Sequence, residues 1–321
     1  MLDKKLRVYN KILDKIKKST NICLITHISP DLDTICSALA FYQFINEKYN
    51  NKKIDIFCAE EIPNKFNFIK KINLFQKTLN PYIYDLIIFF DISSPERSWL
   101  DKTFPKLFNK TTFNTLNIDH HISNTLYSKQ NIVNIIGSST TMIIMDFLIT
   151  LNIKISNITS NYILTWIFSD TWWLKHSNVD QNTYNAISIL LTKWANLNLI
   201  VDNIFKKNEL STIKLWWKIL SNSFIEKNIL YAYVNKTDLD SCDTNYEDIN
   251  WVIDYLNMIQ EADYTTLLTQ KWEYIKWSLR TLREDIDLSK IAKKFNWWGH
   301  KKASWFSIEW KIELNQSIKL I

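Results

Sequence analysis

A set of histidines and aspartates in the first 170 residues of this sequence could together hold divalent metal ions. Most of them follow the end of a short apolar run, and the last follows a predicted helix. In chain order they are His27, Asp31, Asp33, Asp91, Asp119, His120, His121 and Asp170. Imidazole and carboxylate groups bind first-row divalent metals, and carboxylates that converge without cations repel one another. The pattern therefore predicts a two-metal site suited to displacement at phosphorus.

Each of these residues also has an ordinary structural explanation when it is considered alone. An aspartate after a strand is most often a helix N-cap, and a single histidine more often packs than binds metal. The grouping argues against these explanations. Three of the five histidines in the chain, His27, His120 and His121, lie beside carboxylates at the ends of predicted strands.

The elements that must position these residues alternate between strands and helices. Apolar runs predict strands at 21–26, 53–59, 85–90, 115–118 and 131–136. Helical patterns are expected at the N-terminus and at 34–48, 139–151, 158–168, 181–193 and 209–221. This alternation is typical of βαβ units, so we expect an α/β domain with a mainly parallel sheet and flanking helices. Ligands of such sheets gather at the carboxyl ends of the strands.

The pattern changes in the last third of the chain, where predicted strands at 224–234, 262–270, 273–281 and 302–310 outnumber helices at 246–259 and 287–295. We therefore expect a smaller α+β domain after the first one. The predicted division is a catalytic metal-binding domain at 1–195, a helical linker at 196–222 and a substrate-binding domain at 223–321.

Composition excludes several classes of protein. The chain is 46% hydrophobic and 22% charged, as in ordinary globular proteins, and no apolar run approaches the ~18 residues of a membrane span. The N-terminus lacks the apolar core of a secretory signal, and the four cysteines form no CxxC pair. We expect a cytoplasmic protein that does not enter a membrane. The sequence predicts no protein partner and does not indicate an oligomeric state.

Net charge is +6, and most of the excess lies at 271–302. A basic surface of this kind favours anionic partners such as phosphates, although a solvated lysine-rich helix face explains the charge equally well.

The order of these motifs resembles that of the DHH phosphoesterase family, named for the Asp-His-His sequence found here at 119–121. The segments HISPDLDTICSALA, DLIIFFDISSPER, NIDHHISN and FSDTWWLKHSN are similar to its metal motifs, except that Cys36 replaces a glycine in the first. The segment from 275 to 308 resembles the DHH-associated C-terminal domain with its GGGH loop. The resemblance covers about residues 15–312 and is closest to the nanoRNase and pAp phosphatase type.

The resemblance implies a ligand set for two metal ions, with Mn²⁺ expected and Mg²⁺ or Co²⁺ as alternatives. One ion is expected on His27, Asp31 and Asp91. The other is expected on Asp33, Asp91, His120 and Asp170, so that Asp91 bridges the two.

The resemblance also implies roles around the metals and in the second domain. His121 is expected to contact the scissile phosphate or act as an acid, and Asp119 to orient the histidine pair. The expected substrate-binding residues are Ser278, Arg280, Gly299 and His300.

The implied activity is hydrolysis of short oligoribonucleotides, including pApA-like dinucleotides, and of 3′-phosphoadenosine 5′-phosphate (pAp). An exonuclease of this kind (an oligoribonuclease) would act in RNA degradation. One alternative is a pyrophosphatase or polyphosphatase of the same superfamily. Another is a catalytically silent nucleotide-binding protein. This alternative applies if the 14 tryptophans of the chain are true residues and not recoded glycines.

The chain contains 2 glycines and 14 tryptophans, whereas ordinary usage would give ~22 glycines. Several tryptophans stand where the family pattern has glycine, among them Trp172, Trp297, Trp298 and Trp305. We therefore predict that the tryptophans come from UGA codons that the host translates as glycine.

Overall fold

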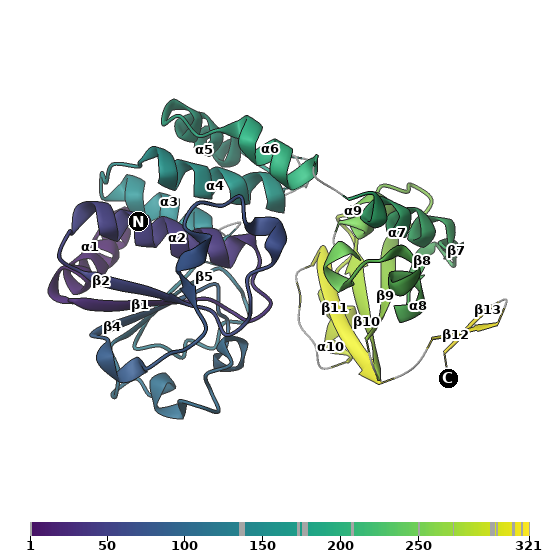
Figure 1. Ribbon diagram of the computed structural model, residues 1–321, viewed down its shortest axis with the longest axis horizontal. Helices are drawn as coiled ribbons and strands as arrows, with labels where there is room; N and C mark the ends of the chain where they lie inside the picture. The colour runs from purple at the N-terminus through teal and green to yellow at the C-terminus, as the bar shows by residue number, and fades with distance from the viewer. Residues whose placement is uncertain are drawn as a thin grey trace. The chain divides into compact units, whose positions relative to one another are not determined.

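The computed structural model describes most of the chain. The described residues are 2–134, 139–171, 174, 179–206, 209–249, 251–271, 273–295, 299, 301–309, 312–315 and 317–320. The chain divides into two compact units, Met1–Lys206 and Lys207–Ile321 (Figure 1). The division lies between helices α6 (Leu197–Phe205) and α7 (Leu210–Ser221), inside the segment that was expected to be a helical linker.

Six parallel strands form the sheet of the first unit, in the order β3-β2-β1-β4-β5-β6. In that order they span Phe75–Gln76, Lys53–Phe57, Asn21–Ile25, Leu86–Phe90, Thr115–Asp119 and Gln130–Val133. The chain leads outward from β1 to β2 and β3 on one side, and from β4 to β5 and β6 on the other. Strands β1 and β4 therefore meet at the switch point of the sheet, where ligands bind in open α/β folds.

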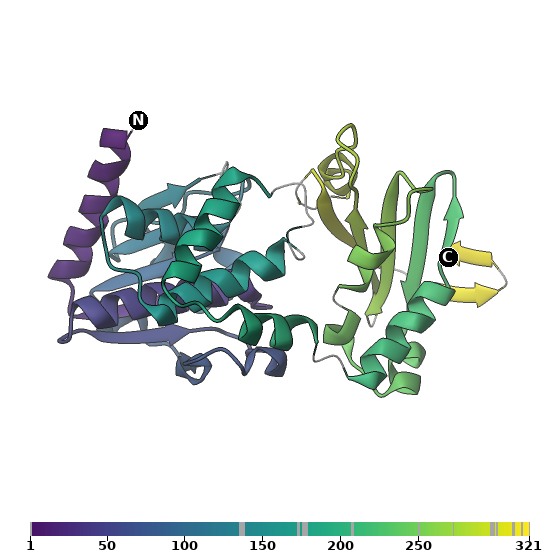
Figure 2. The ribbon, with the colours of Figure 1, turned by 90° about the horizontal axis from the view of Figure 1, so that it is seen from above.

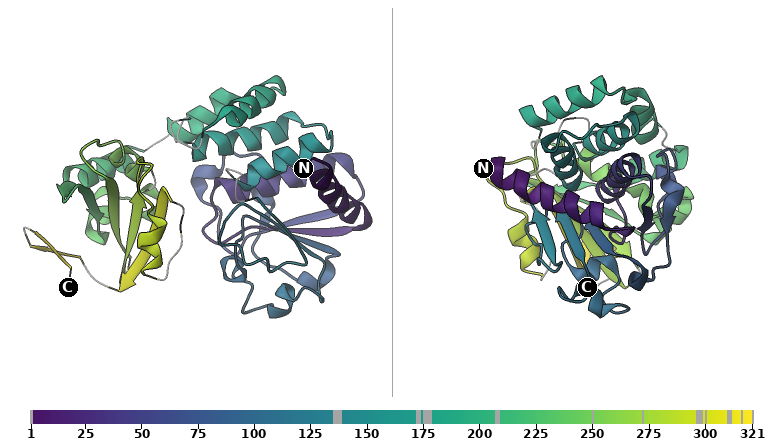
Figure 3. Two further views of the ribbon diagram at one scale, coloured as in Figure 1. Left: turned by 180° about the vertical axis from the view of Figure 1, so that it is seen from behind. Right: turned by 90° about the vertical axis from the view of Figure 1, so that its left-hand side faces the viewer.

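Helices cover one face of this sheet in successive layers. The helices of this unit, besides α6, are α1 (Leu2–Lys18), α2 (Leu32–Lys48), α3 (Thr140–Thr150), α4 (Asn157–Asp170) and α5 (Gln181–Thr192). Helices α2 and α3 lie against the sheet, α4 packs on α2, and α5 and α6 pack outside α4 (Figures 1 and 2). The other face is covered by loops and short 3₁₀ helices around Phe57, Phe89 and Tyr127 (Figure 3). Burial on both faces explains why the central strands are almost wholly apolar.

The second unit is built on a five-stranded mixed sheet in the order β11-β10-β9-β8-β7. In that order the strands span Ala303–Glu309, Tyr274–Arg280, Tyr264–Lys271, Ile229–Val234 and Phe224–Glu226. Helices α7, α8 (Lys236–Cys242) and α9 (Val252–Leu256) pack on one face, and α10 (Ser289–Lys293) packs on the other. Strands β12 (Ile312–Asn315) and β13 (Ser317–Leu320) pair with each other. The two units confirm the predicted fold class, an α/β domain followed by a smaller α+β domain.

The predicted helices of the second unit are shorter in the structure. The helix expected at 246–259 is a 3₁₀ turn at Tyr246–Ile249 followed by α9. Between them Trp251 has a φ of 81°, and this left-handed backbone prevents a continuous helix. Helix α8 was not predicted; Asn235 begins it through a reciprocal hydrogen-bond pair with Asp238. No helix in the described part of the chain is long and apolar enough to cross a membrane.

Three tryptophans among the described residues have a backbone conformation that favours glycine. The φ angles of Trp99, Trp194 and Trp251 are 59°, 63° and 81°. A bulky residue is a genuine outlier in this region, because its Cβ approaches the backbone carbonyl oxygen. These angles support the prediction that glycine stands at these three positions in the native protein.

Trp194 illustrates the point most clearly, since it follows helix α5 in a Schellman motif. Its own N–H donates to the carbonyl of Leu191, and the N–H of Ala195 donates to the carbonyl of Leu190. This bond pattern ends many helices, and the residue at the position of Trp194 is usually glycine. The indole is 84% exposed, so burial does not explain its presence.

We predict that Trp194→Gly raises the free energy of unfolding by about 1 kcal/mol, because it removes a strained φ and little buried surface. Trp217→Gly is the matched control, since Trp217 is 72% exposed but lies within helix α7. That change is expected to lower the free energy of unfolding by roughly 0.5 kcal/mol. Urea denaturation of both variants measures the difference. A destabilised Trp194→Gly variant would contradict the strain argument, and mass spectrometry of the native peptide decides which residue the host inserts.

Candidate metal centre

The candidate site lies where three neighbouring parallel strands end. His27 follows β1, Asp91 follows β4 directly, and Asp119 is the last residue of β5. Since β4 pairs with both β1 and β5, Asp91 stands between the other two loops. The register of the sheet therefore brings together residues that are up to 94 positions apart in the sequence.

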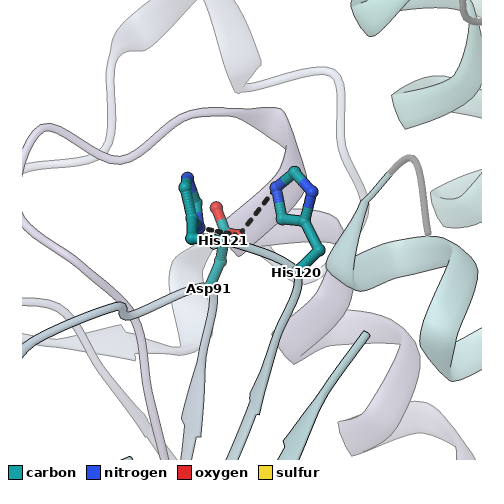
Figure 4. Close-up of side chains that lie close together, drawn as sticks. All are labelled: Asp91, His120 and His121. Carbon is teal, nitrogen blue, oxygen red and sulfur yellow. Dashed lines mark ion pairs between the residues drawn. The ribbon is translucent and has the colours of Figure 1, made fainter. Parts of the chain in front are cut away.

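Asp91 is the central residue of this site. Its side chain is 3% exposed, and Oδ2 lies 3.4 Å from His27 Nε2. Its other oxygen, Oδ1, lies 3.5 Å from His120 Nε2 and 3.5 Å from His121 Nδ1 (Figure 4). Asp91 has a φ of 60°, a conformation that aspartate tolerates better than most residues. Burial would raise the pKa of Asp91, but the three histidines outweigh burial and lower it.

The first group of possible metal ligands is His27, Asp31 and Asp91. His27 Nδ1 lies 2.7 Å from the carbonyl oxygen of Ile28 and must donate to it, because a carbonyl oxygen only accepts. His27 Nε2 then faces Asp91 and, at 3.6 Å, Asp31 Oδ1. This nitrogen is buried and has no hydrogen-bond partner among the described residues. An orphaned ring nitrogen between two carboxylates fits a cation.

The second group is Asp91, His120 and His121. The two imidazole rings lie 4.5 Å apart at their centroids. His121 Nδ1 donates to Asp119 Oδ1 over 2.7 Å, and the same oxygen accepts the backbone N–H of His120. Burial would lower the pKa of His121, but Asp119 and Asp91 outweigh burial and raise this pKa. In His120 the effect of burial is the larger one, and the pKa is lowered.

Asp119 is fully buried and holds the histidine pair in place. Besides its bonds to the two histidines, its Oδ2 accepts a 2.5 Å hydrogen bond from Asn124 Nδ2. Asn124 also donates to Asn117 Oδ1 on β5. Asp119 is therefore well placed to orient His121, as the resemblance implies.

Asp33 lies beside the second group, with Oδ2 3.8 Å from His120 Nε2. Its carboxylate also accepts hydrogen bonds from the backbone N–H groups of Thr140 and Thr141 and from the hydroxyl of Thr141. Asp33 thus ties the start of α2 to the start of α3. Burial and the negative charges of Asp91 and Asp31 raise the pKa of Asp33 well above its usual value. A cation at the second group would offset that repulsion.

Asp170 and the expected substrate-binding residues are not members of the two ligand groups found among the described residues. Asp170 is exposed, ends α4, and belongs to neither ligand group. In the second unit, Ser278 and Arg280 lie two residues apart on β10 and are both half-buried. Gly299 forms a β-bridge with Ser304, and a Cβ at Gly299 would lie 2.3 Å from Ser304 Oγ. His300 lies outside the described residues.

Sequence reasoning missed two residues that support the site. Thr140 Oγ1 donates to Asp91 Oδ1 over 2.9 Å, and Asn124 holds Asp119. The only sequence signal for Thr140 is the run Ser-Thr-Thr before an apolar segment. This run predicts that a helix starts there, but it does not predict that Thr140 contacts Asp91. Asn124 lies within the motif NIDHHISN, where its type alone assigns no role.

We predict that Mn²⁺ affinity increases as the pH is raised from about 6 to about 9. The carboxylates of Asp31 and Asp91 raise the pKa of His27 to about 10, despite the opposing effect of burial. A metal can bind Nε2 only after a proton leaves His27, so lower pH weakens binding. Isothermal titration calorimetry at several pH values measures the slope.

Two variants control this prediction. His27→Gln should bind Mn²⁺ more weakly and with a shallower pH slope, since the competing proton is gone. Asp14→Asn, on the exposed side of α1, should behave like the unaltered protein. A pH-independent affinity in the unaltered protein would contradict the assignment of His27 as a ligand.

Comparisons with known proteins find several similar chains. The uncharacterized protein MG371 of Mycoplasma genitalium is 24% identical over 326 residues, covering 96% of this chain and 91% of its own. Its homologue in Mycoplasma pneumoniae is 22% identical, covering 97% of this chain and 94% of its own. A crystal structure of an exopolyphosphatase-related protein from Bacteroides fragilis has a TM-score of 0.81 at 20% identity. The structural match covers 92% of this chain and 89% of the Bacteroides fragilis chain.

The structural likeness shows that both units occur together in another protein. The family comparison concerns the first unit and includes the loops after β1, β4 and β5. Residues 21–168 match the model described as the DHH family, N-terminal domain.

Proposed function

We propose that this protein is a metal-dependent phosphoesterase that hydrolyses short oligoribonucleotides and pAp with two divalent ions. The observation that carries the proposal is the position of Asp91, whose carboxylate belongs to both groups of possible metal ligands. The match of residues 21–168 to the DHH family domain supports a phosphoesterase. The similarity to the Bacteroides fragilis protein, which is exopolyphosphatase-related, is consistent with chemistry at phosphorus.

The residues of the site have separate proposed roles in binding the metals. His27, Asp31 and Asp91 would hold one ion, and Asp91, Asp33 and His120, with Asp170, would hold the other. Two divalent ions, when bound, supply positive charge to both the attacking and the leaving oxygen of a displacement at phosphorus. Mn²⁺ suits this mixture of imidazole and carboxylate ligands, and Mg²⁺ or Co²⁺ are alternatives.

His121 is the proposed proton donor to the leaving group. During hydrolysis a water molecule gives up a proton to solvent as its oxygen becomes bonded to phosphorus, the bond from phosphorus to the leaving oxygen breaks, and that oxygen takes up a proton. The Nδ1 atom of His121 is committed to Asp119, so the proton would come from Nε2. The raised pKa of His121 favours the protonated ring that a general acid requires.

The second unit would select the substrate. We propose that Ser278, Arg280, Gly299 and His300 bind a phosphate of the nucleotide chain. An arginine can form two parallel hydrogen bonds with a phosphate, and a residue without a side chain permits close approach of the backbone. If these residues bind a nucleotide, they favour nucleotide hydrolysis over the alternative, a pyrophosphatase or polyphosphatase. A silent nucleotide-binding protein is the outcome if tryptophans at 297 and 298 fill the loop.

We predict that Asp91→Asn loses Mn²⁺-dependent turnover by on the order of 10³-fold or more, because both ions lose a charged ligand. Asparagine tolerates the left-handed backbone at this position and keeps the shape of the side chain. The assay measures product release from pAp, pApA, a five-nucleotide RNA, pyrophosphate and a long RNA. Asp14→Asn is the control, and near-normal turnover in Asp91→Asn would show that the ligand assignment is wrong.

We further predict that Arg280→Gln raises KM for pAp and pApA by roughly 10- to 100-fold, as expected for loss of a charged hydrogen bond. KM for pyrophosphate should change little. Arg283→Gln is the matched control, since Arg283 lies nearby but pairs with Asp263 and Asp285. An equal effect of Arg280→Gln on pyrophosphate would favour a general phosphate site instead of nucleotide selection.

A further inference from the structure

Arg97 is a cation close to the candidate metal centre that the roles described above leave unused. It lies in the 3₁₀ helix Pro95–Ser98, six residues after Asp91 in the loop that follows β4. This loop is fixed to the loop after β1, because the carbonyl oxygen of Arg97 accepts the backbone N–H of Ile28 over 2.9 Å. Arg97 is therefore anchored next to His27.

The loop that carries Arg97 lies between the two loops that carry the histidines of the site. His27 follows β1 and His121 follows β5, and β4 pairs with both of these strands. Arg97 belongs to the loop after β4, which begins with Asp91.

Arg97 has no neutralising partner that would explain this position. Its Nε atom is buried and has no hydrogen-bond partner among the described residues, and we find no ion pair of Arg97 within the described part of the chain. Burying a guanidinium N–H without a partner is costly, and such groups in a native site commonly face a ligand. An arginine that only balanced the nearby carboxylates would be expected to pair with one of them.

We propose that Arg97 binds the non-bridging oxygens of the phosphoryl group that reacts at the Asp91 centre. The planar guanidinium matches two phosphate oxygens, and its fixed charge would stabilise the negative charge that develops on them. This inference rests on the proposed phosphoesterase function. It adds a substrate-contacting residue on the first unit, separate from the residues of the second unit.

The first experiment measures binding without turnover. Calorimetry follows Mn²⁺ binding to the full chain and then binding of inorganic phosphate to the Mn²⁺-loaded protein, for the unaltered chain, Arg97→Gln, Arg97→Lys and Arg7→Gln. Arg7 is exposed on α1 and serves as the matched control. We expect Arg97→Gln to bind Mn²⁺ normally and phosphate roughly 10-fold or more weakly, with Arg97→Lys between.

The second experiment compares kcat and KM for the best substrate of the unaltered enzyme. Arg97→Gln should lower kcat by on the order of 10²-fold, since the contact strengthens as charge develops in the transition state. If no phosphoester is hydrolysed, the proposed function fails, whereas the phosphate titration still tests Arg97 itself.

Two results would overturn the inference. If Arg97→Gln binds phosphate as tightly as the unaltered chain, Arg97 does not contact the phosphoryl group. If Arg97→Gln weakens Mn²⁺ binding to the same degree as phosphate binding, Arg97 supports the ligand loops and has no direct role toward the substrate. Should Arg97→Gln not fold, Arg97→Lys carries the same comparison, because it keeps the charge but loses the two parallel donors.

Discussion

The buried carboxylate of Asp91, shared by three imidazole rings, is the constraint on which this site depends. A nearly inaccessible carboxylate is costly in an apolar interior unless cations or hydrogen bonds compensate it. Here Thr140 supplies one hydrogen bond, and His27, His120 and His121 lie at 3.4–3.5 Å. Those distances exceed a good hydrogen bond and leave room for ions between the groups. The arrangement fits residues that could hold metal ions.

The fold makes this convergence possible through the order of its strands. Because β1 and β5 flank β4, the loops that carry His27, Asp91 and His120 leave the same edge of the sheet. Helix α3 adds its N-terminus, whose N–H groups hold Asp33 and whose first residue bonds to Asp91. The positive end of a helix dipole at this point further stabilises the buried carboxylates. The candidate ligand groups are thus positioned by the strands of the sheet and by helix α3.

Many of the strands of the first unit, and the residues that cluster after them, could be predicted because the sequence patterns that indicate them are local. The apolar runs of β1, β4 and β5 are buried on both faces, and the ligand residues follow them within a few positions. The contact between Thr140 and Asp91 could not be predicted, since it joins residues 49 positions apart through tertiary packing. The break in the helix expected at 246–259 depends on the backbone of Trp251, and tryptophan does not signal a left-handed residue. If residue 251 is glycine in the native protein, the tryptophan in the sequence explains why a continuous helix was predicted at 246–259.

Anomalous X-ray diffraction from crystals grown with Mn²⁺ tests directly whether Asp91 joins two metal ions. We expect two anomalous peaks, one beside His27 and Asp31 and the other beside His120, each within about 2.0–2.3 Å of an Asp91 oxygen and about 3.5–4 Å apart. Peaks that avoid Asp91, or a single ion that contacts neither His27 nor His120, would show that Asp91 does not join two ions.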